Sequence, residues 1–258
     1  MDTISLEHRP VGDRIDLAVA LLFAPGHRPC VEDIKALSLA QAQFAVTLES
    51  GEAGEKQQWV ELLANGLTFD LSGLAPGQGG QSVAEGHFFG LADEFDPAVC
   101  EAISVSPGPH LTSGGTMVPV LRCLAWLATQ LAELEHLRAI VWKPARTICS
   151  PEYYRDTVGR WIGGGAFPGL GLTALVLQPD GSMISEGLAL FTGQELRLDA
   201  SLAEDKSEGA KVAVRLLHWL VENGKVDQSM SLTGPSGETL VLEPQPEQGM
   251  VRVWRGSR

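Results

Sequence analysis

Residues 142–224 read WKPARTICS PEYYRDTVGR WIGGGAFPGL GLTALVLQPD GSMISEGLAL FTGQELRLDA SLAEDKSEGA KVAVRLLHWL VENG. This stretch contains the clearest local signals in the chain. Ser150, Pro151 and Glu152 predict a helix start. A hydroxyl can cap the first N–H groups, proline suits the first helical position, and a carboxylate suits the positive first turn. Gly163 can end this helix, and the glycine-dense loop 163–171 follows it.

Downstream of the loop we predict a strand at 172–177 and a hairpin formed by 184–191 and 194–199 about Thr192-Gly193. Asp205 and Glu208 predict the start of an amphipathic helix, which runs to Asn223 with Gly224 just past its end. Short strands are expected near 230–232, 239–242 and 251–254.

Upstream, Asn65-Gly66 separates two apolar runs. Both residues accept the positive φ angles of a type I′ turn, so a hairpin is predicted. A short helix is expected at 31–41. Thr116 is expected to cap a second helix, whose apolar positions recur every three to four residues.

Strands outnumber helices, and several strands are joined by hairpins. We therefore expect an α+β fold with largely antiparallel sheets and packed helices. The length allows two α/β halves, which we place at 1–95 and 96–258, or one compact domain.

The composition excludes several classes of protein. The 258 residues carry a net charge of −13, and no basic stripe is present that could neutralise nucleic-acid phosphates. The N-terminus does not resemble a secretory signal, and the apolar run 17–23 is too short to span a bilayer. The four cysteines are far apart and do not have metal-ligand spacing. We expect a soluble, cytoplasmic protein without a metal or a cofactor.

Gly169, Gly171 and Ala174 fit the spacing of a dinucleotide-binding fingerprint. That fingerprint requires a strand before it and a helix after it. Here the predicted order is reversed, so we interpret the segment as a helix-to-strand connection.

His110 follows a Pro-Gly-Pro turn and is a candidate acid or base. Cys149 precedes the Ser150 helix start, where the positive helix end could lower the pKa of the thiol. For both residues a structural role is the favoured interpretation, because no partner motif accompanies them.

Glu186, Arg197 and Asp199 are the remaining candidates for a binding site. A two-residue turn at 192–193 would place Glu186 directly opposite Asp199, with Arg197 nearby. Two directly opposed carboxylates are destabilising unless a cation lies between them or one of them is protonated. The favoured interpretation is a solvated ion-pair cluster around Arg197, and the alternative is a small polar site for a cationic ligand or a metal.

The segment 185–196, SEGLALFTGQEL, together with the helix that ends at Asn223-Gly224, resembles a bacterial family catalogued as domain of unknown function 4261. Members share a Gly-Leu-x-x-Phe-Gly-x-x-Glu-like hairpin, then a helix, then short strands. Thr192 stands where glycine is usual, and Gly193 follows it. The resemblance covers residues 183–258. It implies an α+β module in a bacterial protein and supplies no activity.

The leading functional hypothesis is a non-enzymatic protein-binding module of a regulatory or immunity-like accessory kind. It rests on good core patterning without a set of nucleophile, base and oxyanion donor. The first alternative is an enzyme or small-molecule binder whose cleft is formed by the loops 72–82 and 163–171. A second alternative is a homo-oligomer that pairs an edge strand at 251–254 across a two-fold axis.

Overall fold

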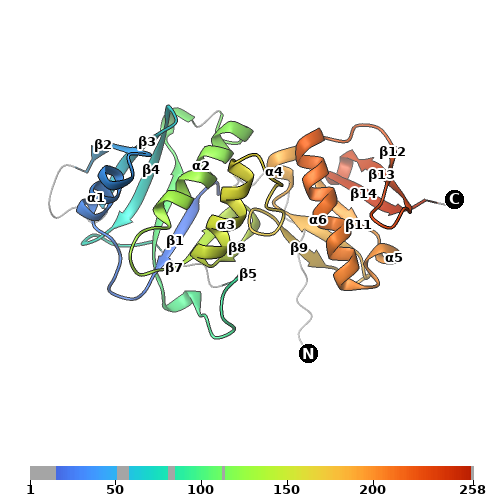
Figure 1. The fold of residues 1–258 in the computed structure, drawn as a ribbon, viewed down its shortest axis with the longest axis horizontal. Helices are drawn as coiled ribbons and strands as arrows, with labels where there is room; N and C mark the ends of the chain where they lie inside the picture. The colour runs from blue at the N-terminus through green and yellow to red at the C-terminus, as the bar shows by residue number, and fades with distance from the viewer. Residues whose placement is uncertain (1–15, 51–57, 81–84, 112–113, 257–258) are drawn as a thin grey trace.

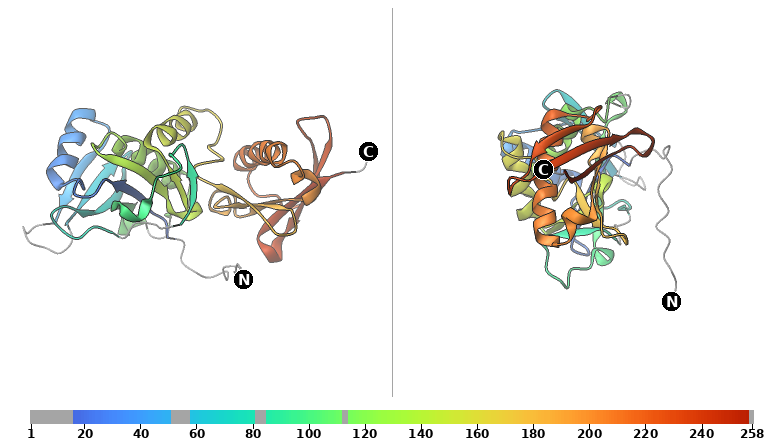
Figure 2. Two further views of the ribbon diagram at one scale, coloured as in Figure 1. Left: turned by 90° about the horizontal axis from the view of Figure 1, so that it is seen from below. Right: turned by 90° about the vertical axis from the view of Figure 1, so that its right-hand side faces the viewer.

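The computed structural model describes residues 16–50, 58–80, 85–111 and 114–256. Within these ranges the chain forms helices and two sheets whose strand pairs are mostly antiparallel. The predicted α+β class is therefore confirmed. The two sheets lie side by side along the longest axis of the molecule, and the longer helices cover the same side of both (Figures 1 and 2).

The larger sheet contains eight described strands in the order β2-β3-β4-β6-β1-β7-β8-β5. All neighbours are antiparallel except β5 and β8. The strands are β1 (Val19–Phe23), β2 (Ala45–Glu49), β3 (Gln58–Ala64), β4 (Leu67–Leu74), β5 (His87–Phe89), β6 (Glu101–Pro107), β7 (Leu137–Trp142) and β8 (Thr147–Cys149).

The turn between β3 and β4 is the predicted hairpin. Asn65 has a φ of 50° and Gly66 a φ of 78°, and the strands pair antiparallel from Ala64↔Leu67 outward. The positive φ angles explain why this dipeptide ends one strand and begins the next.

The helices of this half are α1 (Val31–Gln41), α2 (Val118–Leu131) and α3 (Pro151–Ile162). As predicted, the Ser150 hydroxyl accepts a hydrogen bond from the Tyr153 N–H at 3.1 Å. The predicted Thr116 cap is wrong, because Met117 is the N-cap residue of α2 and no side chain caps that helix. Pro119 lies in the first turn, where an N–H would have no helical partner.

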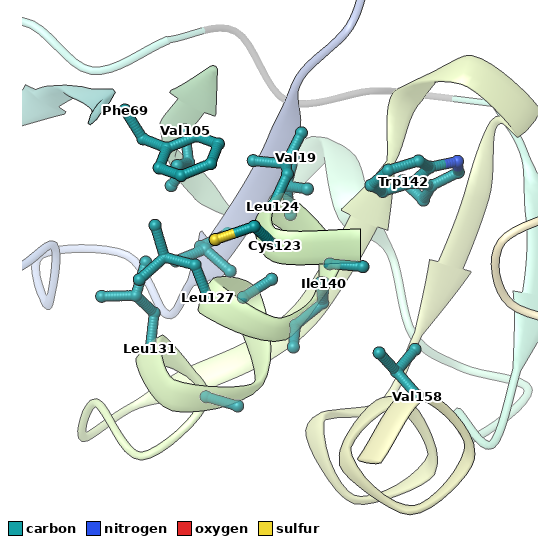
Figure 3. Packing of buried hydrophobic residues seen from close by; sticks show 14 of the residues in the cluster. Val19, Phe69, Val105, Cys123, Leu124, Leu127, Leu131, Ile140, Trp142 and Val158 are labelled. Carbon is teal, nitrogen blue, oxygen red and sulfur yellow. The ribbon is translucent and has the colours of Figure 1, made fainter. Parts of the chain in front are cut away.

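The core of this half lies between the larger sheet and α2 (Figure 3). Leu124 and Leu127 of α2 contribute to the same fully buried cluster as Val19 and Val105 of the sheet. Each buried leucine removes apolar surface that contributes about 1.5–3 kcal/mol to folding. The three-to-four spacing of the α2 sequence thus corresponds to its inward face.

The smaller sheet contains six described strands in the order β12-β13-β14-β11-β10-β9. They are β9 (Ala174–Leu177), β10 (Met183–Glu186), β11 (Glu195–Leu198), β12 (Met230–Thr233), β13 (Thr239–Gln245) and β14 (Met250–Arg255). The helices are α4 (Ala189–Thr192), α5 (Ala200–Ala203) and α6 (Lys206–Asn223).

The start and the end of α6 agree with the sequence prediction. Asp205 accepts hydrogen bonds from the Ser207 and Glu208 N–H groups, and Gly224 follows the last turn. The apolar stripe of α6 packs on one face of the smaller sheet, against Leu196 and Val253 among others.

The predicted hairpin about Thr192-Gly193 is wrong. β10 and β11 pair only at Met183↔Leu198 and Ile184↔Arg197, and the turn of helix α4 lies between the two strands. Consequently Glu186 does not oppose Asp199.

A division at residues 95–96 does not match the sheets. β1 to β5 precede that point and β6 to β8 follow it, yet all eight form one sheet. The sheets separate between Cys149 and Ala174 instead. The predicted edge strand at 251–254 is also wrong, because β14 lies between β13 and β11; the edges of that sheet are β12 and β9.

Candidate functional site

His110 and Cys149 do not lie on neighbouring elements of the larger half. His110 is an exposed residue of the 3₁₀ helix Pro109–Leu111, which follows β6. Cys149 is in β8, separated from β6 by β1 and β7. Burial raises the pKa of the Cys149 thiol to about 12. The helix end therefore does not activate this thiol, and the favoured structural interpretation of Cys149 agrees with its environment.

Glu186 joins the two sheets. Its carboxylate accepts hydrogen bonds from Arg146 Nε at 2.6 Å and Arg146 Nη2 at 2.8 Å, and it lies 3.0 Å from His87 Nε2. Burial alone would raise the pKa of Glu186, but the hydrogen bonds from Arg146 and His87 outweigh it and hold the pKa at about 2. The carboxylate is thus firmly ionised and a poor proton acceptor.

Close packing beside Glu186 supports a structural role for this ion pair. Gly187 has a φ of 90°, and a Cβ there would lie 2.6 Å from the Cβ of Ala145. Farther along the junction, the Trp142 ring stacks on Phe191 with centroids 6.3 Å apart. Glu186 therefore holds β10 against the larger sheet, and it does not form a site with Arg197 and Asp199.

The motif 185–196 owes its shape to Glu195. This largely buried carboxylate accepts hydrogen bonds from the backbone N–H groups of Gly187, Leu188 and Ala189. It also accepts a hydrogen bond from the Ser185 hydroxyl. Burial raises the pKa of Glu195, while these hydrogen bonds oppose the shift. The glutamate of the motif thus organises the α4 turn.

Arg197 and Asp199 do line a cavity, of about 340 Å³, on the face of the smaller sheet opposite α6. Arg197 Nη2 lies 2.5 Å from Asp180, and Arg252 Nη2 lies 2.5 Å from Asp199. Hydrogen bonds from Ser182 lower the pKa of Asp180, and the hydrogen bond from Arg252 lowers that of Asp199. The sequence identified Arg197 and Asp199 as candidates but not Asp180 or Arg252. Asp180 lies in the turn between β9 and β10, and Arg252 lies in β14.

The loops 72–82 and 163–171 do not share a cleft in the described part of the chain. The first loop folds over Arg28, which donates hydrogen bonds to the carbonyls of Gly73 and Gly77. The second packs on α6, where the Phe167 N–H donates to His218 Nδ1 at 3.1 Å. The five cavities described here draw no lining residue from either loop. Residues 81 and 82 lie outside the described ranges.

A series of hollows lies beside α2 on the helix-covered side of the larger sheet. Figure 1 shows α1 and α2 standing apart over that sheet. Three hollows, of about 510, 590 and 540 Å³, follow one another there. Leu37 and Glu133 line both the first and the second hollow, and Gln43 lines both the second and the third. We call these three adjoining hollows the α1–α2 groove.

One wall of the groove is a single stripe of α2 and the residues just after it. The stripe follows helical spacing and comprises Pro119, Arg122, Cys123, Trp126, Thr129, Gln130 and Glu133. The fourteen helical steps from Pro119 to Glu133, at 1.5 Å each, give this stripe a length of roughly 20 Å. The remaining lining includes residues of α1 and the β3–β4 turn, and Arg155 and Ile162 of α3. Gln41 Nε2 crosses the groove to the Gln130 carbonyl at 3.2 Å.

The two ends of the groove differ in character. One end is apolar and aromatic, lined by Leu67, Pro119, Trp126 and Ile162 around Arg122. The other end holds Asp33 and Glu135 beside the imidazoles of His27 and His136, which are tilted by 37° with centroids 4.1 Å apart. Glu133 also lines this end, and its carboxylate pairs with Arg155. Arg28 also lines that end, but its guanidinium is turned toward Glu101 and two backbone carbonyls. The exposed groups there are therefore mainly acidic.

No protein-family model, curated protein or solved structure matches this chain. The resemblance to domain of unknown function 4261 stays a prediction. Among the described residues, no group of three or more histidine, cysteine, aspartate or glutamate side chains has the geometry to hold a metal ion. The described helices likewise include none with the length and apolar character needed to cross a bilayer.

Proposed function

We propose that this chain is a non-enzymatic protein-binding module of a regulatory or immunity-like kind, and that its α1–α2 groove receives a segment of a partner protein. The observation that carries the proposal is the set of three adjoining hollows, which share Leu37, Glu133 and Gln43 and follow one side of α2 and the residues just after it. A trough of roughly 20 Å suits a few turns of helix or a short extended segment.

Charge favours one kind of segment. The chain has a net charge of −13, and Asp33 and Glu135 add exposed negative charge at one end of the groove. A partner segment with basic side chains at that end and an apolar side chain near Trp126 complements both ends. Electrostatic complementarity of this kind speeds encounter and fixes the direction of binding.

A polar group in the wall adds support. The side-chain oxygen of Gln41 is buried and has no hydrogen-bond partner among the described residues. Buried acceptors are almost always paired in folded proteins. A donor on the bound segment, after a small shift of this side chain, would complete the pairing.

The environment of Cys149 supports a non-enzymatic role, because burial keeps its thiol protonated. Cys30, Cys100, Cys123 and Cys149 are all free. Free thiols are typical of reducing compartments, which supports placing this function in the cytoplasm.

Two leucines of α1 offer a matched test. Leu37 lines the groove, whereas Leu39 is 84% exposed and does not line it. A photoreactive benzoylphenylalanine at position 37 should crosslink to a discrete partner in cells, and wild-type protein should compete with the crosslink. The same group at position 39 should not give this product. Equal crosslinks at both positions, or none at 37, would contradict the proposal.

The crosslinked segment then defines a direct binding experiment. A synthetic peptide of that segment should bind the purified protein in calorimetry, and Glu135→Lys should weaken binding roughly tenfold if one favourable charge contact becomes repulsive. Equal charge reversal at exposed Glu208 on α6 is the control. A peptide that binds both variants as tightly as wild type would place its site elsewhere.

A further inference from the structure

The smaller sheet has an open face that the groove does not use. Arg197 of β11 and Arg252 of β14 are direct neighbours in the parallel register, and both alternate with residues of the core that α6 covers. Their side chains therefore project from the opposite face. The two guanidinium groups stand next to each other over the middle of the sheet.

Both guanidinium groups are held in place. Asp180 pairs with Arg197, and Asp199 pairs with Arg252. Asp180 is itself fixed by the Ser182 N–H at 2.9 Å and the Ser182 hydroxyl at 2.6 Å. Side chains that are already oriented lose little freedom when a ligand binds, which favours recognition.

These four charged groups line a solvent-open cavity of about 340 Å³, within the size range of small-molecule sites. Gln245 and Gln248 add amide donors and acceptors to its lining. A neighbouring hollow of about 390 Å³ shares Asp199 and Arg252 and adds the partly exposed indole of Trp254. Arg252 lies 5.5 Å from the centre of that indole ring.

The charges of the cavity decide the class of ligand. Two guanidinium groups and two carboxylates cancel, so neither an anion nor a cation gains a net attraction. What remains is a dense array of planar donors and acceptors beside an aromatic ring. A hydroxyl group can donate one hydrogen bond and accept another at the same time. Two adjacent hydroxyl groups can therefore bind both oxygens of a carboxylate, two N–H groups of a guanidinium, or the oxygen and the NH₂ group of an amide.

From this arrangement we propose that the cavity and the neighbouring hollow together bind a neutral polyhydroxylated ligand, that is, a sugar, and that Trp254 in the neighbouring hollow contacts its apolar face. Asp180, Arg197, Asp199 and Arg252 are the residues that bind its hydroxyl groups. This site lies on the smaller sheet, whereas the α1–α2 groove lies over the larger one. The proposal of sugar binding is therefore independent of the proposed protein binding.

The test is calorimetry and thermal melting of the full chain with defined probes. Maltose, cellobiose and maltotetraose represent free disaccharides and a longer glycan, while sodium phosphate and putrescine represent an anion and a cation. At least one sugar should bind saturably and raise the melting temperature. Sodium phosphate and putrescine should bind less tightly than that sugar. Tighter binding of either charged probe, or no binding of any sugar, would overturn the proposal.

Two variants separate the site from a general effect on folding. Arg252→Met should weaken sugar binding roughly tenfold or more by removing a charged donor. The double variant Asp180→Asn and Asp199→Asn keeps a residue that can cap α5, but leaves two uncompensated guanidinium groups. It should lose sugar affinity and gain affinity for sodium phosphate. Lys211→Met on α6 is the control, and sugar binding that responds equally to all three changes would refute the assignment.

Discussion

At the scale of single residues, the ion pair of Glu186 makes stability depend on pH in a defined window. The folded-state pKa of about 2 lies below the ordinary value of 4.5. The stabilisation is therefore complete above pH 4.5 and is lost as the pH falls from 4.5 toward 2. Arg146 is about half exposed, so solvent screening leaves a contribution of about 2 kcal/mol.

Glu186→Gln should accordingly lower the free energy of unfolding by about 2 kcal/mol at pH 7, in urea titrations followed by circular dichroism. The difference from wild type should shrink as the pH falls below 4.5 and should be mostly lost at pH 2. Glu208→Gln, which removes an exposed pair with Lys211, is the control and should change little. If the difference in the free energy of unfolding between the variant and the wild type stays constant with pH, the ion pair of Glu186 does not cause that difference.

Burial also predicts the reactivity of the cysteines. Cys149 is buried with a thiol pKa of about 12, whereas Cys30 and Cys100 are partly exposed. Iodoacetamide at pH 8 should therefore modify Cys30 and Cys100 in the folded protein and leave Cys149 unmodified until urea unfolds the chain. Peptide mass spectrometry reads each site separately. Rapid modification of Cys149 in the native state would mean that β8 opens locally.

At the scale of elements, Glu195 controls whether residues 184–199 form a helical turn or a hairpin. Glu195→Gln leaves an amide whose NH₂ group cannot accept the backbone N–H donors of Gly187 to Ala189. A buried, unsatisfied group of this kind costs about 1–3 kcal/mol. Urea unfolding should show that loss, and amide exchange should accelerate first at residues 187–189. Glu243→Gln serves as the control, because Glu243 is exposed on β13 of the same sheet.

The hydrogen bonds of Glu195 also explain why the sequence prediction of a hairpin over residues 184–199 was wrong. The apolar residues of this segment alternate in a way that also suits a hairpin, and the decisive bonds run from Glu195 to N–H groups six to eight residues earlier. By contrast, Asn65-Gly66, Ser150 and Asp205 act within three residues of themselves, and the elements that they begin or end were predicted correctly.

The candidate sites show the same dependence on sequence separation: residues close in the sequence were identified, and residues far apart in the sequence were missed. Arg197 and Asp199 are two residues apart and reach the same cavity, but Arg252 joins them only through the pairing of β11 with β14. The α1–α2 groove combines side chains from residue 27 to residue 162. Hydrophobic periodicity identifies the inward face of α2 but does not show which element stands opposite its outer face.

At the scale of the whole molecule, an aromatic cluster connects the two sheets. Phe191 of α4 stacks on Trp142 of β7, and its ring is 4.9 Å from Phe167 and 6.2 Å from Trp161 between centroids. The core of the larger half thus includes a residue of the smaller one. We expect both halves of the wild-type chain to unfold in one transition, because a buried shared core couples them.

Phe191→Ala should weaken this coupling. Loss of a buried phenylalanine ring costs about 3–5 kcal/mol in a typical core, and here the loss falls on the junction. Tryptophan fluorescence and far-UV circular dichroism should give coincident unfolding curves for the wild type and separated curves for the variant. Phe88→Ala is the matched control, because Phe88 is 47% exposed on β5 and should leave one transition. Two transitions already present in the wild type would mean that the ion pair of Glu186 and the aromatic cluster align the halves without making them one cooperative unit.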